Sequence, residues 1–210
     1  MADAVVSFFA NMPVKALNKE IDFNTDALKC QLHTSTYAPN LLTHDYQDDL
    51  TNEVAAGGEY VTGGVAMTTC AVTLVTAASA PAWATATAYK LGQLVRKVAS
   101  NGHIYRCIVA GTSDASEPTW PTNPGEDVVD NTAKWEEAGS AYLKLDADDP
   151  LWAASTITAR YGVIVDTTPG SAATNPLVVL IDFLADKSSS GGEFKITFDA
   201  TYGIGLLRIV

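Results

Sequence analysis

The last third of the sequence is a series of short, β-branched segments separated by turn residues. The segment STITARYGVIVDTT (155–168) is followed, after TPGSAATNP, by LVVLIDF (177–183), EFKITF (193–198) and GIGLLRIV (203–210). The stretch LADKSSSGG (184–192) has the composition of a turn. Strands at roughly 8–12-residue spacing indicate an antiparallel sandwich or barrel. No periodic helix longer than a few turns is predicted after residue 20. The predicted class is therefore all-β, with an antiparallel β-sandwich or jelly-roll-like body.

The first half of the chain contains weaker signals of the same kind. Residues 4–18 are predicted to form a short amphipathic helix that Pro13 restricts to a helix start or a kink. The alternative is an exposed arm that docks on a neighbouring subunit. Leu28, Cys30 and Leu32 alternate with polar residues, as in a half-buried strand. Further strands, hairpins and loops are expected in NLLTHDYQDDLTNEV (40–54), GGEYVTGGVAM (57–67), TTCAVTLVTA (68–77) and AYLKLDADDPLW (141–152).

Residues 80–139 differ in composition from the segments on either side. They hold five of the twelve Trp and Tyr residues and are flanked by the small-residue linkers TAASAPA (76–82) and EEAGSA (136–141). So small a domain needs its aromatic side chains as core. We predict a discontinuous body, 1–79 plus 140–210, that carries residues 80–139 as a module inserted in a loop.

The charge and the cysteines exclude several classes of protein. The formal net charge is −11 and the pI is near 4.5, so the chain would repel nucleic-acid phosphates and anionic membranes. Asp3 stands where a secretory signal has basic residues, which predicts folding in a cytoplasm. Three cysteines without a CxxC pair predict neither a disulfide framework nor a zinc site. Cys30 and Cys70 are interpreted as buried thiols.

Residues 82–138 contain a series of short motifs at a characteristic spacing. AW at 82–83, YKLGQLV at 89–95, GHIYRC at 102–107, Pro118 and a closing Trp135 stand at a spacing that resembles the chitin-binding type 3 carbohydrate-binding modules. In that family an exposed aromatic pair follows the second strand and stacks on the sugar ring. Here that position reads IVAGTSD and contains no aromatic residue, which puts sugar binding in doubt.

The phrase AGTSDASEPTWPTNPGEDVVDNTAKW (110–135) is similar to the version of this module that is common in tailed-phage virion proteins. Outside the insert, residues 20–54, 143–165 and 177–198 resemble a family of small structural proteins encoded by tailed phages. These resemblances imply a virion component, on either the head or the tail.

Candidates for chemistry are few. His33, His44 and His103 lie in three different segments, and no GxSxG, HExxH, P-loop or GxGxxG motif occurs. His44 precedes Asp45, but no nucleophile at a recognisable spacing supports a general base, so no catalytic residue and no cofactor are predicted. Two acidic clusters have the hard oxygen ligands that calcium takes, although solvated turns explain such runs more simply. These weak candidates are Asp45, Asp48, Asp49 and Glu53 in one loop, and Asp146, Asp148 and Asp149 in another.

Trp120, Tyr105 and Trp135 are the candidate ligand contacts. Trp120 lies in EPTWPTNPG, a loop stiffened by prolines that would present an aromatic ring for stacking. The simpler alternative, which the composition favours, is that Trp120 covers a small hydrophobic core, and Trp83, Tyr89 and Trp135 are expected to be structural.

The first hypothesis is a non-enzymatic capsid decoration (cement) protein, located in the virion after assembly in the host cytoplasm. It would bind the major capsid protein or other virion proteins as a homo-oligomer or symmetric array. The module would face outward and offer weak adhesion to host-surface glycans. Alternatives are a tail, neck, baseplate or fibre component that helps recognise the host and, from another class, an accessory of a glycan-active enzyme.

Overall fold

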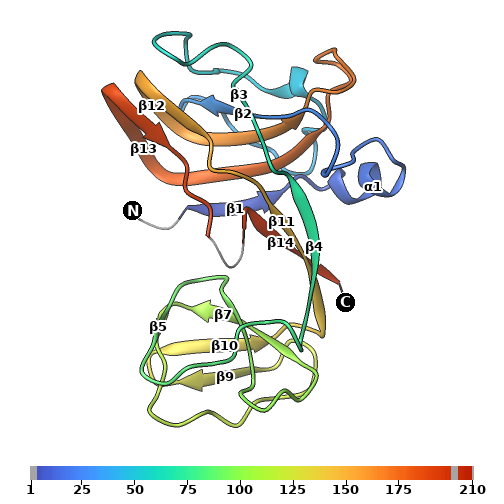
Figure 1. The fold of residues 1–210 in the computed structure, drawn as a ribbon, viewed down its shortest axis with the longest axis vertical. Coiled ribbons are helices and arrows are strands. Elements are labelled where there is room, and N and C mark those ends of the chain that lie inside the picture. Colours follow the sequence, from blue (N-terminus) through green and yellow to red (C-terminus); the bar gives the residue numbers. More distant parts are fainter. Residues whose placement is uncertain (1–3, 200–202, 210) are drawn as a thin grey trace. The chain divides into compact units, whose positions relative to one another are not determined.

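The computed structural model describes residues 4–199 and 203–209, of which 205–209 by backbone only (Figure 1). The fold is all-β with several antiparallel sheets, which confirms the predicted class. The described helical elements are α1 (Met12–Leu17) and the 3-10 turn η1 (Gln47–Asp49). The strands are β1 (Val5–Phe8), β2 (Leu28–His33), β3 (Val65–Ala66), β4 (Ala71–Thr76), β5 (Ala88–Tyr89), β6 (Leu94–Arg96), β7 (Ile104–Val109), β8 (Gly111–Thr112), β9 (Asp127–Asp130), β10 (Ala133–Glu137), β11 (Ala141–Asp146), β12 (Leu151–Asp166), β13 (Leu177–Lys195) and β14 (Gly205–Ile209).

The chain forms two compact units. The first unit comprises residues 1–71 and 146–199, and the second unit comprises residues 72–145 and 200–210. The second unit therefore includes most of β4 and β11, two strands that the sequence analysis assigned to the body. The independent folding of residues 80–139 as an inserted module stays a prediction.

One five-stranded antiparallel sheet, in the order β1-β13-β12-β2-β3, forms the centre of the first unit. Val163 on β12 lies opposite Gln31 on β2 and Leu180 on β13. Val163, Ile164 and Val165 are all fully buried. A run of consecutive buried residues shows that both faces of the sheet are covered here. β2 is likewise buried on both faces, because Gln31 and His33 are inaccessible along with Leu32, so the predicted half-buried strand is corrected.

β13 is longer than predicted. Its 19 residues run through LADKSSSGG, which the composition assigned to a turn, so that prediction is wrong. The segment pairs with β12 with register shifts, and Leu184 and Gly191 take positive φ angles of 61° and 63°. Polar residues are tolerated because most of their side chains are exposed. Thr158 and Ser188 join the two strands by a hydroxyl–hydroxyl contact of 2.9 Å.

The N-terminal segment divides into a strand and a helix, so the helix predicted over residues 4–18 is corrected. Val5–Phe8 pair with Val179–Asp182 of β13 as an edge strand. The helix is confined to Met12–Leu17 and has Pro13 in its first turn, where the missing N–H costs nothing. Residues 5–8 pair with β13 instead of continuing the helix, and the next residue, Phe9, is buried beside β13.

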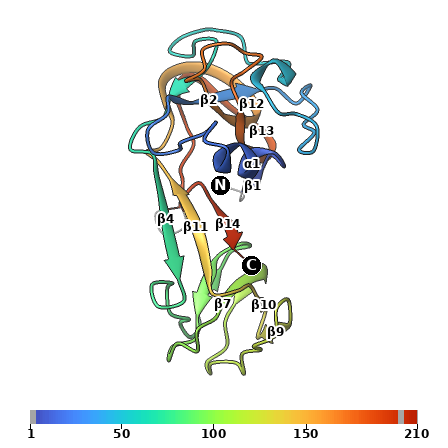
Figure 2. The same cartoon turned by 90° about the vertical axis from the view of Figure 1, so that its right-hand side faces the viewer.

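The second unit contains three sheets. The largest has the order β6-β7-β10-β9, a three-stranded sheet has the order β14-β11-β4, and β5 pairs with β8. In the three-stranded sheet β11 lies between β4 and β14 and is antiparallel to β14 (Figure 2). A small cluster joins the first sheet to the linkers. It consists of Ala77, Ala80, Leu94, Ile104, Ala138 and Tyr142.

Candidate functional site

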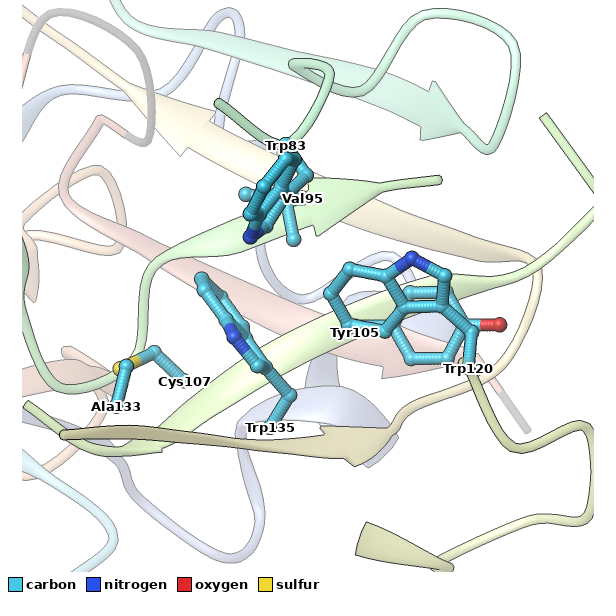
Figure 3. Packing of buried hydrophobic residues seen from close by; sticks show 7 residues of the cluster. All are labelled: Trp83, Val95, Tyr105, Cys107, Trp120, Ala133 and Trp135. Carbon is cyan, nitrogen blue, oxygen red and sulfur yellow. The ribbon is translucent and has the colours of Figure 1, made fainter. Parts of the chain in front are cut away.

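Four aromatic residues of the second unit form one buried cluster (Figure 3). Tyr105 and Cys107 lie two residues apart on β7 and so share a face of the strand. β6 and β10 add side chains to that face, and two loops bring in Trp83 and Trp120. The cluster consists of Trp83, Val95, Tyr105, Cys107, Trp120, Ala133 and Trp135. Few aliphatic residues accompany these aromatics, so the rings themselves supply the core.

The predicted ligand contacts Trp120, Tyr105 and Trp135 are neighbours in this core. The Trp120 ring stacks on Tyr105 with a centroid distance of 4.1 Å and meets Trp135 edge-on at 5.9 Å, as Figure 3 shows. Tyr105 and Trp135 are 0% exposed, and Trp120 is 7% exposed. The fully buried rings of Tyr105 and Trp135 have no face open to a ligand. Glycan contact stays a prediction, and this burial does not favour it.

Asp130 is the polar centre of the cluster. Its Oδ2 accepts hydrogen bonds from the indole N–H groups of Trp83 (2.8 Å) and Trp135 (2.9 Å), and its Oδ1 accepts one from the backbone N–H of Asp114 (2.8 Å). Asp130 is 1% exposed. A buried carboxylate is stable only when donors satisfy it, and here three donors do so. No motif in the sequence indicated this role, because the partners lie up to 47 residues away.

The loop that carries Trp120 is fastened by side-chain hydrogen bonds. The Trp120 indole N–H donates to Glu117 Oε1 (3.0 Å), which also accepts the backbone N–H of Val98 (2.7 Å). The hydroxyl of Tyr105 donates to the carbonyl oxygen of Pro121 (2.9 Å). Burial is the largest cause of the raised pKa of Tyr105, so this hydroxyl stays protonated. These hydrogen bonds hold the loop and the Trp120 ring against the core.

The first acidic cluster serves the local backbone of the first unit. The carboxylate of Asp49 accepts the N–H groups of Asp45 (2.7 Å) and Tyr46 (3.1 Å), and these hydrogen bonds lower the pKa of Asp49. Glu53 accepts the hydroxyl of Tyr60 at 2.8 Å. Asp49 thus reaches back to the start of η1, as in a capping box, and Glu53 serves as the acceptor for a tyrosine hydroxyl.

The second acidic cluster also has internal partners. Asp148 accepts the hydroxyls of Thr69 and Thr68, which lower its pKa in that order. Asp149 pairs with Lys195 at 2.9 Å, and Asp146 accepts the N–H of the next residue. Within residues 4–199 and 203–209, no group of three or more His, Cys, Asp or Glu side chains is placed to hold a metal ion.

His33 and His44 both pack against the ring of Tyr37, at centroid distances of 5.1 and 5.8 Å, whereas His103 belongs to the second unit. His44 Nδ1 lies 2.9 Å from the Tyr37 hydroxyl. His103 Nδ1 lies 2.8 Å from Oε1 of Glu137, whose side chain is 2% exposed. His33 is buried, and its Nδ1 lies 2.9 Å from the carbonyl oxygen of Thr51. Among the described residues, no serine or cysteine side chain is hydrogen-bonded to any of these rings.

The buried ring of His33 predicts acid sensitivity. Burial is the largest cause that lowers the pKa of His33, opposed by the hydrogen bond to Thr51 and by Glu53. A lowered pKa in the folded chain means that protons bind the unfolded chain better, so this contribution to stability is present above the ordinary histidine value of about 6.5 and is lost as the pH falls below it. We expect His33→Gln to flatten the decline of the free energy of unfolding between neutral and mildly acidic pH in urea titrations. An unchanged slope would contradict this assignment.

The cysteines are free thiols. Cys30 and Cys107 are buried, whereas Cys70 is only partly buried, so the interpretation as an inert core thiol holds for Cys30 and less well for Cys70. Burial raises the pKa of Cys107 to about 11 and that of Cys30 to about 12. Thiols with such pKa values are not nucleophilic at neutral pH.

The net charge is divided unequally between the two units. The first unit contains 17 Asp and Glu against six Lys and Arg, a net charge of −11. The second unit contains seven of each sign and is neutral. The whole formal charge of the chain therefore belongs to one compact unit. A field of one sign acts on the rate and specificity of association with charged partners.

Comparison of the chain with protein-family models, with curated proteins and with solved structures finds no match. Among the described helices, none has the length and hydropathy of a membrane-spanning segment.

Proposed function

We propose that the chain is a non-enzymatic structural protein of a tailed-phage virion, attached to the head as a decoration protein. The observation that carries the proposal is the charge division: an acidic unit of −11 joined to a neutral unit. The segments that resemble small phage structural proteins lie mainly in the acidic unit, and those that resemble the phage version of the carbohydrate-binding module lie in the neutral unit.

The first unit is the attachment unit in this proposal. Its negative charge fits basic patches on the major capsid protein or another virion protein. A single contact of this kind is weak and salt-dependent. A shell repeats the same site many times, so an oligomer or symmetric array of the chain gains avidity from simultaneous contacts.

The second unit is the displayed unit. Its tryptophan N–H groups from Trp83, Trp120 and Trp135 all bond to carboxylates of the same unit. A platform for sugar stacking would need a ring with an open face, and the buried cluster favours bulk over adhesion. Any host-surface glycan contact would involve Trp120, which at 7% exposed is the least buried of the three candidate rings.

Charge variants test the attachment role. We expect the double substitution of Asp48 and Glu193 to Lys to weaken binding of the purified chain to heads that lack it, and to make binding less dependent on salt. Both residues are exposed in the first unit. The measurement is a co-sedimentation titration at several salt concentrations, with heads from the virus that encodes the chain.

The matched control is the substitution of Glu126 and Asp127 to Lys. These exposed residues belong to the neutral second unit, and the control changes the net charge by the same amount. The control variant should bind as the unaltered chain does. Equal weakening by both variants, or binding that does not respond to salt, would argue against an electrostatic attachment unit. Binding to tails but not to heads would move the proposal to a tail component.

A further inference from the structure

Asn101 and Gly102 form the only Asn-Gly pair in the sequence and lie in the turn between β6 and β7. Both residues are exposed. Gly102 has a φ angle of 85°, and a side chain built on it would meet no atom within 4 Å. No side chain hinders access to the backbone nitrogen of Gly102, since glycine carries no Cβ. The N–H has one long hydrogen bond, 3.4 Å to the hydroxyl of Ser100.

The Asn101 side chain is held in a fixed orientation over this peptide. Its Oδ1 accepts the backbone N–H of His103 at 3.3 Å, and its Nδ2 donates to the hydroxyl of Tyr105 at 2.7 Å. A side-chain oxygen bonded to the N–H two residues on closes an Asx turn. The ring of that turn contains both Cγ of Asn101 and the nitrogen of Gly102, so the two atoms are held near each other. The donor on Oδ1 also polarises the Cγ carbonyl.

We propose that Asn101 is a site of spontaneous deamidation through a cyclic imide. The backbone nitrogen of Gly102 attacks Cγ of Asn101 and forms a new C–N bond. The Cγ–Nδ2 bond breaks, and ammonia leaves with the proton that the Gly102 nitrogen lost, carried through solvent. Water then opens the five-membered imide at either carbonyl, and the product is aspartate or isoaspartate at position 101. The reaction consumes one water, releases one ammonia and involves no oxidation.

The modification would reach the aromatic core through Tyr105. The Tyr105 hydroxyl now accepts a hydrogen bond from Asn101 and donates its single hydrogen to the carbonyl of Pro121. A carboxylate at 101 has no hydrogen to donate, so the phenol hydrogen must turn toward it and release Pro121. Pro121 follows Trp120, whose ring stacks on Tyr105. Deamidation therefore loosens the loop that fastens Trp120, and isoaspartate adds a further backbone atom to the turn.

The test is peptide mapping by mass spectrometry of the intact, folded chain aged in mildly alkaline buffer. Asn24 and Asn131 are internal controls, because both are exposed and both precede a β-branched threonine. We expect Asn101 to convert roughly tenfold or more faster than either control, since the glycine nitrogen is unhindered and close to Cγ. The rate should be at least as high in the folded chain as in urea. Conversion at the rate of the controls, or protection of Asn101 by folding, would overturn the proposal.

Three variants separate the deamidation reaction from its structural consequence. Gly102→Ala hinders the attacking nitrogen and should slow the loss of Asn101, whereas Asn101→Gln keeps an amide and should not form the imide. Asn101→Asp reproduces one product and should shift the tryptophan emission of the chain as ageing does. A Gly102→Ala chain that folds and deamidates at the unaltered rate would contradict the imide route. An aged chain whose fluorescence stays unchanged despite conversion would contradict the coupling to Trp120.

Discussion

Replacement of Asp130 by Ala is expected to lower the free energy of unfolding by about 3–5 kcal/mol, since unsatisfied buried donors cost about 1–3 kcal/mol each and two buried donors and one partly buried donor are left here. The three donors are the indole N–H groups of Trp83 and Trp135 and the backbone N–H of Asp114. The two indole N–H groups lie in a core where Trp135 is fully buried. Urea unfolding followed by tryptophan fluorescence measures the loss.

The matched control for this substitution is Asp127→Ala. Asp127 lies on the same strand, and its 2.7 Å ion pair with Lys134 is exposed to solvent. Exposed pairs contribute little, so the control should change the unfolding free energy by less than about 1 kcal/mol. Comparable losses in the two variants would show that the carboxylate of Asp130 does not organise the tryptophans.

Gly64→Ala is expected to destabilise the first unit by more than about 3 kcal/mol, because a forced φ and a backbone collision act together. Gly64 has a φ angle of 76°, and an added methyl group would collide with the carbonyl oxygen of Cys30 and lie 2.8 Å from Cα of Gln31. Both atoms belong to the backbone of β2, an inner strand of the five-stranded sheet, and cannot move without disturbing the pairing of β2 with β12. Thermal unfolding of the purified variant measures the effect.

Gly63 supplies the control for the collision. It precedes Gly64 and also has a positive φ, 92°, but an added methyl group would meet no atom within 4 Å. Gly63→Ala therefore carries the conformational cost alone, about 1–2 kcal/mol. If the two alanine variants unfold at the same temperature, the close approach of Gly64 to β2 is not a stability determinant.

Periodicity and turn chemistry were enough to predict the fold class and the central strands. The buried run Val163–Val165 and the alternation of Leu28, Cys30 and Leu32 both lie in the sheet of the first unit. The error at residues 184–192 has a physical cause. Serine, glycine and aspartate mark turns by local preference, yet pairing with β12 supplies hydrogen bonds that override the preference.

The organisation of the aromatic cluster could be predicted only in part. The concentration of tryptophan and tyrosine in residues 80–139 indicated an aromatic core, and burial of Trp83, Trp120 and Trp135 agrees with that interpretation. The role of Asp130 could not be predicted, because the distance from Trp83 to Asp130 depends on how a loop returns to β9. Hydrogen bonds between residues distant in sequence leave no pattern in a single chain.

The most direct test of the virion assignment is immunogold electron microscopy of intact particles, with an antibody raised against residues 82–138. As a head decoration protein with a displayed second unit, the chain should be labelled over the whole head surface. Label confined to the tail or neck would contradict attachment to the head, and particles without label, if the antibody recognises the purified chain, would contradict display of the second unit.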